Sequence, residues 1–289
     1  MFIQSVLICI FINISFITFR CVIAVQPDIV YSFGPNSSDI SLPKNDDGSY
    51  GPIRLNFKLR FFDKIYSKVY VSTNGLISFL SPINKNYPLN NYISTPFISP
   101  FWSDINTLKG GQIYYRESFC SCDLYQAKTD IANIYSATFN PSRLYIITWD
   151  QVAAFNGNSS LNNTFQLVIA TDGKLSFLIF NFGIMSWPNS QFTMNSFFGY
   201  NAGDNINYYS YPDSFTNNIT NVAFKSNVNV PGKWVFIAYF TNSTTTSSTT
   251  STPLTTKTTS TISTTSTTTT INTSLVPGSL VYTLTGHKW

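Results

Sequence analysis

The sequence of 289 residues contains little charge, one glutamate and one histidine. Charged residues make up 10% of it, against about 25% in a typical globular protein. The histidine is His287, near the C-terminal end. No Ser-His-Asp triad, Cys-His dyad or His-based zinc site can therefore form in the body of the chain. The GxSxG, GxxxxGK[ST] and GxGxxG motifs are also missing, so we expect no catalytic residues, no cofactor and no enzyme.

The basic residues do not form a run anywhere in the sequence. The formal net charge is +4, and the 17 Lys and Arg residues are spread along the chain. A protein that binds nucleic acid usually concentrates its basic residues in one stripe or tail. We therefore expect no nucleic-acid partner.

The N-terminal segment is apolar and predicts export. Residues 2–19 are hydrophobic, and Val22 and Ala24 occupy positions −3 and −1 of a cut after Ala24. We expect residues 1–24 to be a signal peptide, with a secreted, extracellular product and no membrane span after its removal. The alternative is an uncleaved anchor, since the stretch approaches the ~20 residues that a membrane span needs.

Cysteine is scarce for a secreted protein. Removal of the signal peptide takes away Cys9 and Cys21 and leaves Cys120 and Cys122. A spacing of one residue is awkward for the geometry of a mutual disulfide, so a local bond and an intermolecular bond both stay open. A metal site is not expected, because no other Cys or His in the folded part can complete the shell.

Sequons for N-glycosylation are frequent. They are Asn36, Asn158, Asn162, Asn218, Asn242 and Asn272. Together with a signal peptide they predict a secreted glycoprotein, whose sugars would supply the solubility that sparse charge does not.

The composition divides the mature chain into three parts. Residues 25–240 are rich in apolar and aromatic residues and predict one globular domain. Residues 241–274 are almost entirely Thr and Ser, which predicts a disordered, mucin-like O-glycosylated stalk, with an unmodified linker as the alternative. Residues 275–289 form a short C-terminal tail.

The pattern of the globular part is that of β-strands. Residues 53–61 alternate between apolar and polar, which predicts a half-buried strand. Asn74-Gly75 and Asp172-Gly173 each separate two apolar runs, which predicts two hairpins, the first with a type I′ turn. Further strands are expected at 112–116, 143–149, 197–200 and 234–240, and the runs 167–169 and 177–180 predict strands covered on both faces. We expect an all-β, antiparallel β-sandwich-like domain without helices, followed by the disordered Thr/Ser-rich tail.

A series of short motifs resembles a known extracellular module. In order, the series includes Leu42-Pro-Lys-Asn-Asp-Asp-Gly48, Val69-Tyr-Val-Ser-Thr-Asn-Gly-Leu-Ile-Ser-Phe79, Ser99-Pro-Phe-Trp-Ser-Asp104 and Gly232-Lys-Trp-Val-Phe236. Residues 31–240 resemble the nidogen-like (NIDO) domain of nidogen, alpha-tectorin and mucin-4-type proteins. The resemblance implies a non-enzymatic module of matrix and cell-surface proteins, associated with cell-matrix adhesion. Its expected partners are matrix proteins or a second copy of the chain, with glycans as a further candidate.

A few acidic side chains allow a competing interpretation. Asp104, Asn106, Asp150 and Asp204 carry the oxygen ligands that calcium prefers, although their spacing is not that of an EF-hand. If they converge, the chain could be a calcium-assisted carbohydrate-binding module. A hydrolase using Asp104 and Asp150 is a third hypothesis. The competing interpretation of Asp104 is structural, with its carboxylate accepting backbone N–H bonds at a turn.

Overall fold

The structure is a computed structural model that describes residues 6–7, 23–24, 29–86, 94–132, 134–135, 138–157, 160–191, 194–204 and 206–238. Most of the predicted signal peptide lies outside the described residues, and so do Asn158, the stalk at 241–274 and the tail at 275–289. The sequons at Asn242 and Asn272 therefore also lie outside them.

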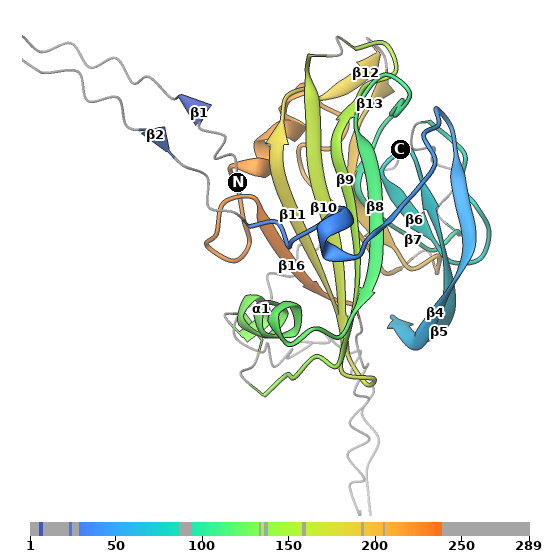
Figure 1. Cartoon of the computed structure of the whole chain (residues 1–289), viewed down its shortest axis with the longest axis vertical. Helices are drawn as coiled ribbons and strands as arrows, with labels where there is room; N and C mark the ends of the chain where they lie inside the picture. Colours follow the sequence, from blue (N-terminus) through green and yellow to red (C-terminus); the bar gives the residue numbers. More distant parts are fainter. Residues whose placement is uncertain are drawn as a thin grey trace, which may run out of the picture. The chain divides into compact units, whose positions relative to one another are not determined.

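Two six-stranded antiparallel sheets build the body (Figure 1). In spatial order, the first sheet contains β16 (Lys233–Ile237), β11 (Ser176–Met185), β10 (Asn162–Thr171), β9 (Arg143–Ala153), β8 (Gln112–Ser118) and β3 (Ile40–Ser41). The second sheet contains β15 (Tyr208–Ser210), β14 (Phe197–Asn201), β7 (Phe97–Trp102), β6 (Leu76–Ser78), β5 (Lys64–Ser72) and β4 (Ser49–Phe61). The predicted all-β sandwich with hairpins is confirmed.

Four short strands and three helical segments complete the described structure. The strands are β1 (Val6–Leu7), paired with β2 (Ile23–Ala24), and β12 (Asn189–Gln191), paired with β13 (Met194–Asn195). The helical segments are α1 (Ser121–Ala132) and the 3-10 turns Pro35–Ser37 and Asn217–Ala223.

The main core fills the space between the two sheets with aromatic rings. Phe61, Phe79 and Phe101 from the second sheet and its turns meet Trp149 and Phe165 from the first. Trp149 stacks on Phe165 at 5.2 Å, and Phe101 lies 5.5 Å from Phe165. Large rings bury much apolar area, so this layer accounts for part of the high Phe and Tyr content of the sequence.

The first sheet is also covered on its outer face. A second cluster packs Tyr31, Ala127 and Ile131 against Ile146 and Val168. Strands β9, β10 and β11 are therefore buried on both faces, which explains their continuous apolar runs and confirms that expectation. The outer face of the second sheet carries a smaller cluster of Leu76, Ile83, Phe97, Trp102 and Phe197.

The helix α1 was not expected from the sequence. Its buried residues are Asp123, Ala127 and Ile131, at a spacing of four. Such a stripe holds only two apolar side chains, so the hydrophobic periodicity that reveals most helices is nearly absent. The prediction of a domain without helices was wrong at this point.

The Asn74-Gly75 hairpin forms, but its turn differs from the prediction. Ser72 pairs with Leu76, which leaves three residues in the turn, and only Gly75 has a positive φ, of 78°. A type I′ turn needs positive φ at both central residues. Asn74 is instead fully buried, where its side chain bonds to neighbouring loops.

Candidate functional site

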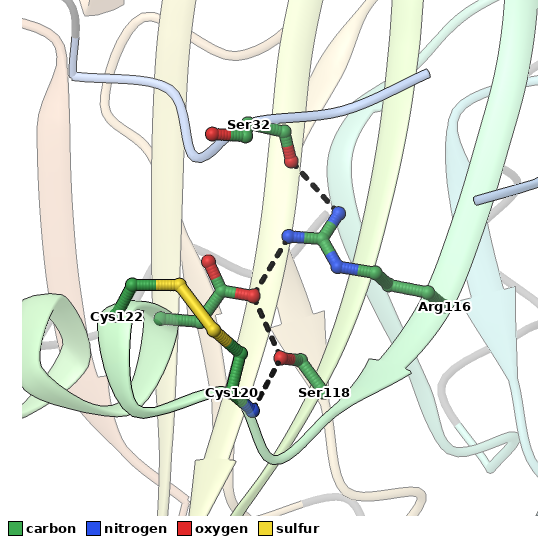
Figure 2. The surroundings of a disulfide bond; sticks show 6 residues. Ser32, Arg116, Ser118, Cys120 and Cys122 are labelled. Atoms are coloured by element: carbon green, nitrogen blue, oxygen red, sulfur yellow. Dashed lines mark hydrogen bonds and ion pairs between the residues drawn. A yellow bond between two sulfur atoms is a disulfide. The ribbon is translucent and has the colours of Figure 1, made fainter. Parts of the chain in front are cut away.

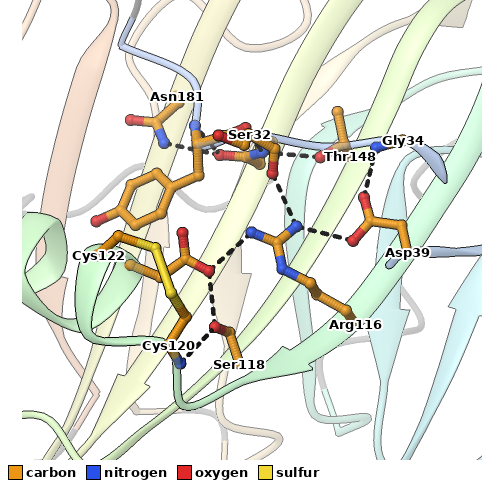
Figure 3. Close-up of polar contacts among 12 residues, drawn as sticks. Ser32, Gly34, Asp39, Arg116, Ser118, Cys120, Cys122, Thr148 and Asn181 are labelled. Atoms are coloured by element: carbon orange, nitrogen blue, oxygen red, sulfur yellow. Dashed lines mark hydrogen bonds and ion pairs between the residues drawn. A yellow bond between two sulfur atoms is a disulfide. The ribbon is translucent and has the colours of Figure 1, made fainter. Parts of the chain in front are cut away.

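Arg116 on β8 is the centre of a buried polar network on the outer face of the first sheet (Figures 2 and 3). Its guanidinium lies 2.8 Å from Asp39 and 2.8 Å from Asp123, and it also donates to the carbonyl oxygen of Ser32 at 2.7 Å. Burial acts to lower the pKa of Arg116, but hydrogen bonds and charge from Asp123 and Asp39 outweigh it and raise the pKa. The segment 31–39 and helix α1 are thus both bound to the guanidinium of Arg116.

A disulfide lies beside this network. The structure joins Cys120 to Cys122, whose Cα atoms are 5.4 Å apart. Ser118 connects the two features, because its hydroxyl donates to Asp123 at 2.6 Å and accepts from the backbone N–H of Cys120 at 3.2 Å (Figure 2). The bonded pair therefore sits where β8 turns into α1.

A row of polar side chains continues the network across three strands (Figure 3). Gln166 on β10 donates to Thr148 at 2.8 Å and accepts from Asn181 at 3.2 Å. It also exchanges two hydrogen bonds with the backbone of Tyr31, at 2.9 and 3.0 Å. This amide therefore pairs with the chain segment above it, much as a neighbouring strand would.

Tyr31 links the segment to α1. Its hydroxyl donates to Asp130 at 2.9 Å, and Asp130 also forms an ion pair with the buried Lys233 of β16. Burial, together with the charge of Asp130, raises the pKa of Tyr31 well above its usual value. The hydroxyl stays protonated at neutral pH, which suits a structural donor.

The charged groups of this network pair with one another and stabilise the fold. Each charge of the network faces an opposite charge within 3 Å, and buried charges paired in this way are costly to separate. No sequence pattern pointed to Arg116, Asp39 or Asp123, because they come from segments far apart in the chain.

A second group of side chains has the chemistry of a cation site. Carboxylate oxygens of Asp46, Asp47 and Asp104 lie within 4.8 Å of one another. Asn74 donates to Asp47 at 2.8 Å, and Asn86 donates to Asp104 at 3.4 Å. Burial and the charge of Asp47 raise the pKa of Asp46. Carboxylate oxygens are the ligands that calcium prefers.

The structure changes the set of residues for the predicted calcium site. Within the described part of the chain, Asp104 belongs to the only such group of three acids, and its companions are Asp46 and Asp47. Asn106 caps a turn by accepting from the N–H of Leu108. Calcium binding itself stays a prediction. Asp46 and Asp47 could have been found from sequence as an adjacent acidic pair before Gly48.

The two remaining predicted ligands have local partners. Asp150 on β9 accepts from Thr164 at 3.4 Å, and burial raises its pKa. Asp204 closes a turn by accepting from the N–H groups of Ile206 and Asn207. Burial acts to raise the pKa of Asp204, and these hydrogen bonds outweigh it and lower the pKa. Neither carboxylate belongs to the group around Asp104.

Three of the predicted glycosylation sites lie on described residues. Asn36 and Asn218 are exposed, whereas Asn162 at the start of β10 is half-buried. The Oδ1 atom of Asn162 is enclosed by the protein and makes no hydrogen bond within the described structure. The helices of the described part are all too short or too polar to span a membrane.

Comparison with known proteins identifies the family. The nidogen-like domain matches residues 67–239. The chain is 34% identical to human alpha-tectorin over 73% of its own length, 37% identical to chicken alpha-tectorin over 72%, and 29% identical to mouse nidogen-2 over 74%.

The match covers one part of each of these relatives. It spans 10% of the length of the alpha-tectorins and 17% of nidogen-2. No solved structure matches the chain. The chain belongs to the nidogen-like (NIDO) domain family and, like alpha-tectorin and the nidogens, is a secreted, extracellular protein.

Proposed function

We propose that this chain is an adhesive module that binds extracellular matrix proteins or a second copy of itself. The observation that carries the proposal is its membership of the nidogen-like domain family. The fold supports it, because aromatic side chains fill the space between the sheets and the Arg116 network is neutralised by its own partners. A partner therefore binds the outer surface of such a domain.

Exposed aromatic residues beside the disulfide are the first candidates for contact. Phe119 is 72% exposed and Tyr125, on α1, is 73% exposed. Aromatic side chains supply most of the affinity in many protein interfaces. The disulfide and the Arg116 network hold the backbone that carries Phe119 and Tyr125. The two side chains are therefore presented to a partner on a fixed backbone.

The test uses the secreted chain immobilised on a sensor surface and a panel of purified matrix proteins, with sedimentation of the free chain for self-association. We expect binding to at least one matrix protein, or self-association, and a loss of ten-fold or more in the double variant Phe119→Ala, Tyr125→Ala. The matched control is Leu108→Ala, Phe224→Ala, which removes two other exposed apolar side chains. Absence of both activities in the native chain would contradict the proposal.

The same experiment separates adhesion from carbohydrate recognition. Calcium-assisted binding to a glycan array would disappear in a chelator, and the variant Asp104→Asn would reproduce that loss. Protein adhesion through Phe119 and Tyr125 would persist in the chelator.

We also propose that the secreted form is a glycoprotein that begins at Val25 and carries an O-glycosylated stalk at 241–274. The supporting observations are the apolar leader, the six sequons and the Thr/Ser composition. Mass spectrometry of the secreted product tests all three points. We expect N-glycans at the exposed Asn36 and Asn218 and lower occupancy at Asn162. An unprocessed N-terminus and bare sequons would contradict this.

A further inference from the structure

Strands β4 and β5 carry an excess of positive charge. Between residues 54 and 68 lie five cations, Arg54, Lys58, Arg60, Lys64 and Lys68, and one acid, Asp63. The net positive charge of this hairpin equals the formal net charge of the whole chain, +4. The hairpin forms one edge of the second sheet (Figure 1).

The alternation of β4 directs its cations away from the core. Leu55, Leu59 and Phe61 are buried, so Arg54 and Lys58, at the alternate positions, face outward and are exposed. Arg60 continues the same row and is half-buried. At ~3.3 Å per residue, the row from Arg54 to Arg60 runs for roughly 20 Å along one strand.

Strand β5 adds one cation, Lys68, to the same face, because Lys64 pairs opposite the buried Phe61 and therefore belongs to the other face. Lys68 pairs directly opposite Arg54, and like charges in that position repel one another. Lys68 also lies 5.7 Å from the centre of the Tyr70 ring. Within the described part of the chain, Arg54, Lys58, Lys64 and Lys68 take no part in any of the four ion pairs.

We propose that this face of the β4–β5 hairpin binds a linear sulfated polysaccharide. A row of three cations on β4, with Lys68 beside it on β5, matches a polymer that repeats its negative charges along its length. The exposed residues between the cations include Asn56 and Ser67, which can hydrogen-bond to sugar hydroxyls and sulfate oxygens. The partner differs in kind from the matrix proteins of the proposed function, so either proposal can fail alone.

A protein partner fits this face less well. The exposed apolar side chain of the hairpin is Ile65, and the core of a protein interface needs several aromatic or aliphatic anchors. Lysine on an edge strand also blocks edge-to-edge aggregation. Blocking aggregation does not require that all charges on the two strands have the same sign. Binding a polyanion does require it.

Two acids lie close to the hairpin, one in its turn and one beside the middle of β4. Asp63 lies in the turn between the strands, and Glu117 of β8 accepts a hydrogen bond from the backbone N–H of Asn56 at 2.8 Å. With Glu117 counted, the hairpin and its neighbour still hold five cations against two acids.

The experiment measures binding of the full secreted chain to heparin, by anisotropy and by salt elution from a heparin column. We expect retention at physiological ionic strength and a linear fall of log affinity with log salt. The double variant Arg54→Gln, Lys68→Gln should bind at least ten-fold more weakly. Its salt slope should be smaller by about two, one for each lost contact.

The matched control, Lys44→Gln, Lys174→Gln, removes the same charge from two exposed lysines elsewhere and should bind like the native chain. Equal weakening in both double variants, or no retention of the native chain, would overturn the proposal. Binding to anionic vesicles in place of heparin would also overturn it, in favour of a membrane surface. Unchanged thermal unfolding of both variants, with unchanged binding to matrix proteins, would show that only this face was altered.

Discussion

Trp149 of the first sheet donates its indole N–H to the backbone carbonyl of Ser72 in the second sheet, at 3.1 Å. Both residues are buried, and the indole also stacks on Phe165. Most contacts between the sheets are apolar and have no preferred register. This hydrogen bond is directional, and it therefore fixes β9 against β5 beside the aromatic core.

The variant Trp149→Phe should lower the free energy of unfolding by about 2–3 kcal/mol, because it removes this hydrogen bond and leaves a partly filled space. Guanidinium unfolding followed by circular dichroism would measure it. The control Phe165→Leu alters the stacked ring and keeps the hydrogen bond. A loss below about 0.5 kcal/mol for Trp149→Phe would show that the bond does not join the sheets.

Gly75 should not tolerate any side chain. A Cβ atom there would lie 1.9 Å from the carbonyl oxygen of Phe101, and its φ of 78° is unfavourable for other residues. We expect Gly75→Ala to cost at least about 2 kcal/mol, or to prevent secretion. Gly173 has a similar φ of 91° with nothing within 4 Å of the added atom, so Gly173→Ala should cost about 1 kcal/mol. Urea midpoints compare the two, and equal costs would mean that the clash at Gly75 relaxes.

Arg116 should matter more for stability than the neighbouring disulfide. Arg116→Ala leaves the buried carboxylates of Asp39 and Asp123 without their cation, at a cost of about 3–5 kcal/mol. The double variant Cys120→Ser, Cys122→Ser opens a loop of only three residues, which the chain-entropy relation puts at about 1–2 kcal/mol. Exposed Arg143→Ala is the control for loss of charge. The reverse order of costs, in denaturant midpoints, would show that the disulfide holds α1.

Alkaline pH should destabilise the protein through its buried tyrosines. Burial raises the pKa of Tyr31 and Tyr145 well above 10 in the folded state, while in the unfolded state it is about 10. Both states are protonated below pH 10, so this stability is fully present there. As pH rises further, only the unfolded state loses its protons, and each tyrosine costs up to about 1.4 kcal/mol per pH unit. Unfolding midpoints from pH 8 to 11 measure the slope.

The variants Tyr145→Phe and Tyr31→Phe distinguish the roles of the two buried hydroxyls. The hydroxyl of Tyr145 has no hydrogen-bond partner within the described structure, so Tyr145→Phe should keep or raise stability at pH 7 and flatten the alkaline slope. Tyr31→Phe removes a donor to Asp130 and should cost about 1–2 kcal/mol at pH 7. Equal effects at pH 7 would contradict this assignment.

Much of the fold could be predicted because strand patterns are local. The alternation at 53–61 and the runs at 167–169 and 177–180 depend only on which faces of a strand are buried. Turn conformation could not be predicted in the same way. At Asn74 the side chain found partners from distant loops, Asp47 and the N–H of Ile105, and these tertiary bonds outweighed the local preference of Asn-Gly for a type I′ turn.

The sequence by itself determined the β class, the two hairpins and the family, since each follows from residue order and alternation along the chain. The tertiary structure decided which charges meet. It placed Arg116 between Asp39 and Asp123, grouped Asp104 with Asp46 and Asp47, and set Lys68 opposite Arg54. Electrostatic interaction depends on the distance between two charges in space. Strand pairing brings charged residues close together, and their separation along the chain does not predict that distance.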